Sequence, residues 1–185
     1  MTGRGYCLFD TSFGRCGIGW GENGISHFQL PSADSDADDA RLRELTGTAG
    51  PGTPPPVIAK AIADLVAYFD GVAKDFSSFP VDLSSVEPFH ARVLAAARKV
   101  GWGDISSYGA LAREVADDVA VSRAVGQAMG RNPIPVIIPC HRILTADGKI
   151  GGFSAPGGTI TKTRLLELEG ALRKTPALAQ TAFDF

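Results

Sequence analysis

Apolar and small or polar residues alternate through the first thirty residues of the chain, and glycines interrupt the pattern at short intervals. This period of two predicts two or three short antiparallel strands joined by tight turns. The acidic stretch 32–39 is predicted to be a solvated loop, and residues 50–56 form a linker rich in proline and glycine. Apolar residues then recur at helical spacing from Val57 to Gly71. Pro56 suits the first turn of that helix.

The second half of the chain has the pattern of a mostly helical unit. Pro88 can start a helix that ends before the glycines at 101 and 103. Two short helices follow at about 108–115 and 120–131, and a turn at 116–119 joins them as in a helix-turn-helix unit. Beyond them we expect a short buried strand at 136–138, a turn at 147–148, a pocket-lining loop at 151–154 and a helix from about residue 161.

Composition and charge narrow the class of protein. There is no apolar run of about 18 residues, which predicts no membrane span, and no secretion signal at the start of the chain. Three cysteines are too few for a disulfide framework and favour a reducing compartment. The formal charge is −5 over residues 1–84, +2 over 85–172 and +1 over 173–185. The basic surplus of the second half is small, so any contact with phosphates should be local and modest.

A thiol, an imidazole and a guanidinium follow one another at Cys140, His141 and Arg142, immediately after Pro139 ends the apolar run. A thiol beside groups that can stabilise its thiolate is a candidate nucleophile. The alternative is a small buried hydrophobic residue, which is the usual role of a free cysteine. Asn132 is a polar side chain at the kink that ends the preceding helix. It is suited to pinning the segment that carries Cys140.

Small side chains recur along the helix predicted at about 120–131. Ala124, Gly126 and Ala128 have small side chains, and Arg123 projects from the start of the helix. The backbone could therefore approach another surface closely. That surface is either a nucleic acid or a neighbouring helix, and the residues alone favour neither.

A carboxylate, Glu169, falls on the leucine-lined face of the last helix. Burying an unpaired charge is unfavourable, so Glu169 needs a partner. One alternative is a structural ion pair with Arg142 or Arg164. The other is that Glu169 orients His141.

Several short motifs of the second half, in this order and at nearly this spacing, resemble the O6-alkylguanine-DNA alkyltransferases, also called methylated-DNA–protein-cysteine methyltransferases. The matching motifs are Ser107-Tyr108-Gly109, Arg123-Ala124-Val125-Gly126, Asn132-Pro133, Pro139-Cys140-His141-Arg142, Gly151-Gly152-Phe153-Ser154 and Leu165-Leu166 through Glu169-Gly170. In the first half the clearest similarity is Tyr68-Phe69-Asp70-Gly71. Three departures stand out: Asp117-Asp118 replaces a glycine common in the turn between the short helices, Gly101 replaces a usual proline, and two extra residues lie in 155–160.

The resemblance implies an α+β fold in two domains. Residues 1–84 would form an N-terminal domain with a small antiparallel sheet and a helix, of structural or regulatory role. Residues 85–172 would form the alkyltransferase domain, mostly helical with a winged-helix-like, helix-turn-helix DNA-binding motif. Residues 173–185 would be a C-terminal tail.

By the same resemblance, the Cys140 thiolate attacks the alkyl carbon of O6-alkylguanine in double-stranded DNA, with O4-alkylthymine as a further candidate substrate. Glu169 would orient His141, which would deprotonate Cys140 through a water because adjacent side chains diverge. Tyr108 would donate to the departing guanine, and Asn132 would hold the kink. The residues expected to contact substrate or DNA are Ser107, Arg123, Ala124, Gly126, Arg142, Ile143, Phe153 and Ser154.

The resemblance also implies how DNA is handled. A base inside a duplex must be flipped out to react, and Arg123 would occupy the space that it leaves. Because the thioether product has no nearby group to hydrolyse it, each molecule would react once. We expect a monomer without metal or cofactor, away from membranes, in the cytoplasm or, in a bacterium, at the nucleoid.

Three alternatives were weighed against this interpretation. A zinc site would use Cys7, Cys16, His27 and His90, whose spacing matches no common ligand pattern. A cysteine hydrolase would pair Cys140 with one of these two distant histidines, and neither lies in a motif. A non-catalytic sensor or regulator that binds alkylated DNA would keep the helix pair, but relatives of that kind carry tryptophan at the position of Cys140.

Overall fold

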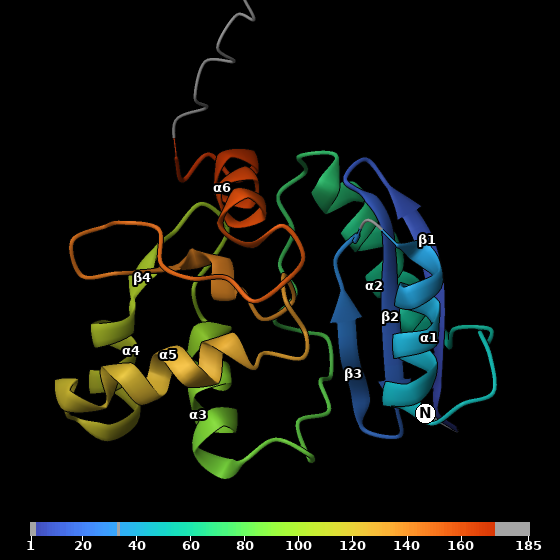
Figure 1. Cartoon of the computed structure of the whole chain (residues 1–185), viewed down its shortest axis with the longest axis horizontal. Coiled ribbons are helices and arrows are strands. Elements are labelled where there is room, and N and C mark those ends of the chain that lie inside the picture. Colours follow the sequence, from blue (N-terminus) through green and yellow to red (C-terminus); the bar gives the residue numbers. More distant parts are fainter. Residues whose placement is uncertain (1–2, 33, 173–185) are drawn as a thin grey trace, which may run out of the picture.

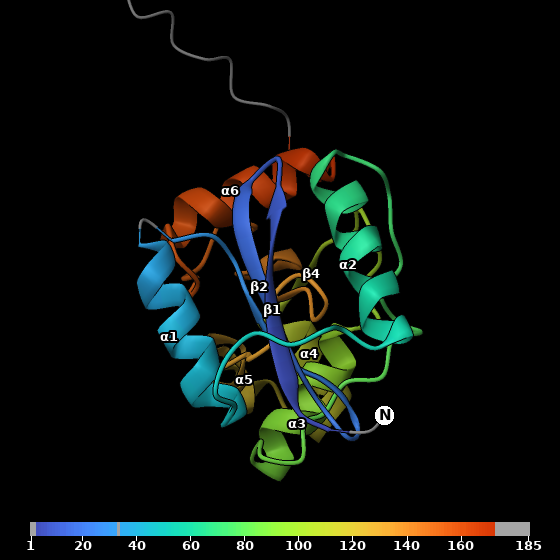
Figure 2. The same ribbon diagram turned by 90° about the vertical axis from the view of Figure 1, so that its right-hand side faces the viewer.

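The computed structural model describes residues 3–32 and 34–172, with the sheet of the first half beside the helices of the second (Figure 1). The predicted tail, 173–185, lies outside the described residues. Strands β1 (Gly5–Thr11), β2 (Gly14–Gly21) and β3 (Gly24–Gln29) form an antiparallel sheet in chain order, which confirms the predicted hairpins. Figure 2 shows α1 (Ser35–Thr46) and α2 (Pro56–Phe69) on opposite sides of these strands.

Helix α1 shows that the loop predicted at 32–39 is wrong. The carboxylate of Asp34 caps the helix by accepting hydrogen bonds from the backbone N–H groups of Asp36 and Ala37, at 3.1 and 3.0 Å. Acidic residues in the first turn also interact favourably with the positive end of the helix dipole. Leu42 is fully buried where α1 packs on β2. The acidic composition is therefore the start signal of a helix.

The helix predicted after the linker is confirmed as α2. Pro56 is its first residue, as expected. The apolar spacing corresponds to the buried side of the helix, which consists of Ile58, Ala61, Leu65, Tyr68 and Phe69. This side of α2 faces the sheet and the second half of the chain.

The second half contains the predicted helix-turn-helix. Helix α3 (Pro88–Ala97) packs against α4 (Tyr108–Ala116) and α5 (Ser122–Gly130), and the short 3-10 helix η1 (Val119–Val121) lies in the turn between the last two. The two-residue strands β4 (Ser106–Ser107) and β5 (Ile143–Leu144) pair in parallel. Helix α6 (Gly158–Leu168) begins slightly before the expected start. Together the two halves confirm the α+β fold class.

The strand predicted at 136–138 is wrong. The segment is buried but turns back on itself, and the Ile138 N–H donates to the Ile134 carbonyl oxygen at 2.8 Å. Val136 has a φ of 71°, in the left-handed region where β-branched residues are rare. The prolines at 133 and 135 have no N–H for a strand ladder. The apolar run therefore predicted the burial of residues 136–138 correctly, but it did not predict their backbone conformation.

A single hydrophobic core runs through both halves. It contains buried side chains of β2, α2, α3, α5 and residues 134–138. The backbone also joins the halves, since the Phe28 N–H of β3 donates to the Pro133 carbonyl oxygen at 2.9 Å. The edge strand of the sheet therefore holds the segment that leads from α5 to Cys140.

Candidate active site

Cys140 begins the 3-10 turn η2 (Cys140–Arg142) and is 6% exposed. Asn132 holds the preceding turn at both ends. Its Nδ2 donates to the Ile138 carbonyl oxygen at 2.8 Å, and its Oδ1 accepts from the Ile134 N–H at 3.0 Å. The same Nδ2 donates to the Cys140 Sγ at 3.1 Å. One amide thus fixes the segment and directs a donor at the sulfur.

The Cys140 thiol lies close to a buried cation. Burial raises the pKa of the Cys140 thiol, while the Asn132 amide and Lys162 act to lower it. Lys162 on α6 is fully buried, and its Nζ donates to the Ile143 carbonyl oxygen at 2.6 Å. Cys140 is therefore a thiol at rest, and two fixed groups favour the negative charge that forms when it loses its proton.

Four buried side chains meet behind Cys140, and we call Tyr68, His141, Arg142 and Glu169 the buried relay. Each is at most 5% exposed. The Oε1 of Glu169 lies 2.8 Å from the Nε2 of His141 and accepts from the Tyr68 hydroxyl at 2.6 Å. Arg142 donates from Nη2 to the same oxygen at 2.9 Å and from Nε to Oε2 at 2.8 Å. Glu169 therefore pairs with Arg142 and His141 at once, so both predicted types of partner are present.

The contacts of the buried relay set its protonation. Burial raises the pKa of Glu169, but hydrogen bonds from His141 and Arg142 outweigh it and bring the value to about 2. Burial lowers the pKa of His141 despite the neighbouring carboxylate, so the imidazole is neutral near pH 7. Because a carboxylate only accepts, Nε2 carries the hydrogen and Nδ1 keeps its lone pair. No protein group in the described part of the chain bonds to that Nδ1. His141 can therefore accept a proton there.

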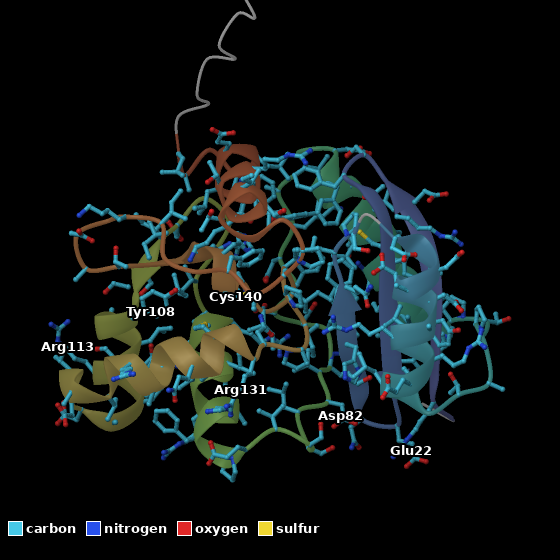
Figure 3. All side chains as sticks on the ribbon, viewed as in Figure 1. Glu22, Asp82, Tyr108, Arg113, Arg131 and Cys140 are labelled. Carbon is cyan, nitrogen blue, oxygen red and sulfur yellow. The ribbon has the colours of Figure 1, made fainter. Side chains whose placement is uncertain are left out.

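On its other side Cys140 lines a cavity of about 480 Å³, with walls from Tyr108, α5 and the loop 151–154. Figure 3 shows Tyr108 and Cys140 on neighbouring segments. Burial, and then the nearby Cys140, raise the pKa of Tyr108, which keeps its hydroxyl protonated as a donor. A Cβ on Gly151 would lie 3.0 Å from that hydroxyl oxygen. A larger residue at position 151 would therefore require the Tyr108 ring to shift by a few tenths of an ångström.

A second cavity, of about 290 Å³, reaches Cys140 from the first half of the chain. Its walls include parts of β3 and α1, together with Asn132, Phe153 and Ser154. Cys140, Phe153 and Ser154 line both cavities. The sulfur thus lies between two spaces as well as in front of the buried relay.

The small residues of α5 divide between two environments. Gly126 lines the larger cavity, and a Cβ there would have no neighbour within 4 Å. Ala128 is instead fully buried between helices. Arg123 is exposed and Ala124 half-buried at the start of the helix. Ser107 caps α4, where its Oγ accepts from a backbone N–H at 3.1 Å. Ala128 therefore has one of the two roles considered for the small residues of this helix, packing inside the protein, while contact with a nucleic acid stays a prediction.

Two residues expected to contact substrate or DNA are placed elsewhere. Arg142 is 5% exposed, and its guanidinium binds Glu169 and a backbone carbonyl. Ile143 is fully buried in β5 and lines neither cavity beside the thiol. The contacts of Arg142 with Glu169 and with a backbone carbonyl fit the structural ion pair that was considered for Glu169. Arg164, the other proposed partner of Glu169, lies over the Phe13 ring at 4.3 Å.

Tyr68 and Lys162 also belong to the site, although neither was predicted there. Both are polar side chains on the buried face of an amphipathic helix. Lys162 precedes Leu165, Leu166 and Glu169 at helical spacing. The signal that singled out Glu169, a polar group on an apolar face, would also have found Lys162, whereas the largely apolar ring of Tyr68 gives no such signal.

No metal site or membrane helix is found in the described residues. Within 3–32 and 34–172, no group of three or more His, Cys, Asp or Glu side chains could hold a metal ion, and this includes the four residues considered for zinc. None of the helices described is long and apolar enough to cross a membrane.

The chain is similar to known proteins across both halves. A family model described as "6-O-methylguanine DNA methyltransferase, DNA binding domain" matches residues 88–171. The methylated-DNA–protein-cysteine methyltransferase of Mycolicibacterium paratuberculosis is 40% identical over 130 residues, 70% of this chain and 74% of that protein. A "DNA base-flipping protein" of Thermus thermophilus is 41% identical over 106 residues, 57% of this chain and 69% of that one.

The solved structures show the same relationship. The crystal structure of Mycobacterium tuberculosis OGT in complex with DNA has a TM-score of 0.69 and 30% identity, covering 89% of this chain and 91% of that chain. The 40% identity to the M. paratuberculosis methyltransferase and the match to the family model show that the chain belongs to the methylated-DNA–protein-cysteine methyltransferase family.

Proposed function

We propose that this protein repairs double-stranded DNA by transferring the alkyl group of O6-alkylguanine to its own Cys140, once per molecule. The observation that carries the proposal is the position of the thiol. Cys140 lies between a cavity and the buried relay, and Asn132 directs a donor at its sulfur. Family membership and the methyltransferase names of the relatives support the same reaction.

The proposed reaction is an in-line displacement. The Cys140 proton passes through a water to the Nδ1 of His141, which the Glu169 carboxylate orients and stabilises as imidazolium. The sulfur forms a bond to the alkyl carbon while the bond from that carbon to O6 breaks. Tyr108 donates its proton to the departing guanine and regains one, through water, from the His141 imidazolium, so that the base ends with a proton in place of its alkyl group. The alkyl group remains on Cys140 as a thioether.

The proposed DNA contacts use α5 and the larger cavity. The small residues of α5 would allow close approach to the minor groove, and the target base would be flipped into the cavity, where Phe153 and Ser154 would contact it. Exposed Arg123 would fill the space that the base leaves. The M. tuberculosis relative solved with DNA supports this partner.

The proposal also assigns a role to each half of the chain and a place in the cell to the protein. Residues 1–84 would support the site, and residues 85–172 would carry the chemistry and the DNA contacts. The protein would act as a monomer without a cofactor, in the cytoplasm or at a bacterial nucleoid. O4-alkylthymine is the second substrate to test.

The mass of the intact protein tests the proposal directly. After incubation with excess duplex that contains O6-methylguanine, each molecule should gain one methyl group, located on the peptide of Cys140. Cys140→Ser should bind the duplex and gain no mass, whereas Cys7→Ser should react like the wild type. Repair of more lesions than there are protein molecules, without a methylated peptide, would overturn the single-use reaction.

The base-flipping relative raises a second candidate, a protein that binds alkylated DNA without reacting. The same experiment separates the two. A wild-type protein that binds the O6-methylguanine duplex more tightly than an undamaged one, but gains no mass, would favour the non-catalytic function.

A further inference from the structure

Tyr68 lies on α2 in the first half of the chain, yet its hydroxyl reaches the buried relay of the second half. The hydroxyl is 2.6 Å from the Oε1 of Glu169, the same oxygen that lies 2.8 Å from the Nε2 of His141. The hydroxyl and Nε2 are themselves 3.4 Å apart. Tyr68 and His141 therefore share one carboxylate oxygen.

The hydroxyl must be the donor in this contact. Glu169 is ionised, and burial together with its charge raises the pKa of Tyr68 well above the ordinary value. Tyr68 thus keeps its proton throughout the physiological range. Its hydrogen bond to Glu169 is charge-assisted and short.

Orientation of Glu169 does not require Tyr68. Arg142 already fixes the plane of the carboxylate with one hydrogen bond to each oxygen. The contribution left to Tyr68 is electrostatic. Each donor on Oε1 withdraws negative charge from the atom that would stabilise an imidazolium at His141.

We propose that Tyr68 is a positioning residue of the buried relay: by sharing Oε1 of Glu169, it limits the basicity of His141 and so sets the pH at which Cys140 ionises. The inference rests on the proposed role of His141 as the base for Cys140. Outside the relay, the charged or titratable groups that act on it or on the thiol in the described residues are Lys162, Tyr108 and Asp75, whose carboxylate interacts with Arg142. A change at Tyr68 leaves all three in place.

Tyr68→Phe tests the inference because it removes only the hydroxyl. The ring, which packs edge-on against Phe69, Phe76 and Trp102, is retained. With one donor fewer on Glu169, His141 should become more basic. The pH midpoint for alkylation of Cys140 by iodoacetamide should fall by roughly half to one pH unit. The measurement is the alkylation rate of the Cys140 peptide against pH, over the range in which circular dichroism shows folded protein.

Tyr6→Phe is the matched control. Tyr6 is also fully buried in the first half, and its hydroxyl donates to a different carboxylate, that of Asp39, at 3.0 Å. This variant should keep the wild-type midpoint even if its stability falls. A Tyr68→Phe midpoint that is unchanged or raised overturns the proposal.

A second substitution keeps the inference testable if the Tyr68→Phe protein does not fold. Site-specific 3-fluorotyrosine in place of Tyr68 keeps the shape and provides a more acidic, stronger donor, so the midpoint should rise. A midpoint that stays constant or falls would contradict the inference. Iodoacetamide requires neither DNA nor O6-alkylguanine, so failure here is distinct from failure of methyl transfer in the intact-mass experiment.

Discussion

The two sides of Cys140 differ in construction. Behind the thiol, the buried relay is closed to solvent, and every charge in it has a partner. In front, the walls of the larger cavity combine glycines with the larger side chains of Tyr108, Met129 and Phe153. In the proposed reaction the relay controls protonation, whereas the cavity receives the flipped base. Substitutions in the relay should therefore change the ionisation of Cys140 itself, even toward a small reagent. Substitutions in the cavity or on α5 should change only the handling of guanine or DNA.

Glu169→Gln should have the largest effect, on the relay side. It leaves Arg142 buried without a carboxylate and removes the charge that stabilises an imidazolium at His141. We expect the reactivity of Cys140 to fall by roughly 100-fold with both free O6-benzylguanine and duplex DNA. We also expect the free energy of unfolding to fall by about 3 kcal/mol. Single-turnover rates and chemical denaturation measure the two effects.

The acid dependence of stability provides the check on Glu169. Its pKa is lowered from the ordinary 4.5 to about 2, so its stabilisation is complete above pH 4.5 and is lost as the pH falls toward 2. This amounts to about 3 kcal/mol in the wild type, and Glu169→Gln should lack it. Glu114→Gln, which removes an exposed ion pair with Lys99, should change stability by less than about 1 kcal/mol. A Glu169→Gln protein that reacts at the wild-type rate per folded molecule would rule out the relay.

Arg123→Ala should affect the DNA side alone. Without its side chain to fill the vacated space, the flipped state of the base is less favourable. We expect repair of a lesion in duplex DNA to slow by roughly 30-fold, against less than about twofold for free O6-benzylguanine. Arg15→Ala, which removes an exposed cation from β2, should leave both rates unchanged. Equal losses on the two substrates would mean that Arg123 supports the fold or the cavity.

Gly151→Ala should disturb the cavity without touching the relay. The new Cβ would lie 3.0 and 3.2 Å from the hydroxyl oxygen and Cε2 of Tyr108, displacing the donor to the leaving guanine. Transfer from O6-alkylguanine should slow by roughly tenfold, while the pH midpoint for iodoacetamide stays at its wild-type value. Gly152→Ala is the control, because its Cβ would have no neighbour within 4 Å. A shifted midpoint in Gly151→Ala would show that the two sides of Cys140 are not independent.

Asp117→Gly should have the smallest effect, far from both sides of the thiol. Asp117 ends α4 in the left-handed region with a φ of 52°, and its carboxylate opposes the dipole at that helix end. The glycine should raise the free energy of unfolding by about 1 kcal/mol. Asp118→Ala should lower it by a similar amount, about 1 kcal/mol, because the Asp118 carboxylate accepts the Ala120 N–H at 2.8 Å. Thermal denaturation should show a higher melting temperature for the variant at position 117 and a lower one for the variant at position 118.

Cys140 and the members of the buried relay were not equally predictable from the sequence. Cys140, His141 and Glu169 could be found because each breaks a local pattern. Tyr68 could not be assigned to the site, because it is 101 residues from Glu169 and only the packing of both halves brings them together. Arg142 could be named as an ion-pair partner of Glu169, but the sequence did not separate that role from a contact with DNA.

The errors in secondary structure have a related cause. The β-branched residues 136–138 are buried as expected, but hydrogen bonds from Asn132 and the lack of proline donors make the segment a turn. In α1 the acidic residues looked like a solvated loop, and the cap at Asp34 became evident only with the sheet in place. Sequence patterns reported burial more reliably than backbone conformation.

The position of Cys140 between two cavities has a consequence for covalent probes. Once guanine leaves, a bulky group on the sulfur can extend toward the smaller cavity, which contains Gln29 and Leu42 from the first half of the chain. The family model matches residues 88–171, outside that half, so we expect the lining of this space to differ from one member to another. A probe whose transferable group carries a tail shaped for this cavity could label one family member selectively, although the chemistry at the sulfur is shared.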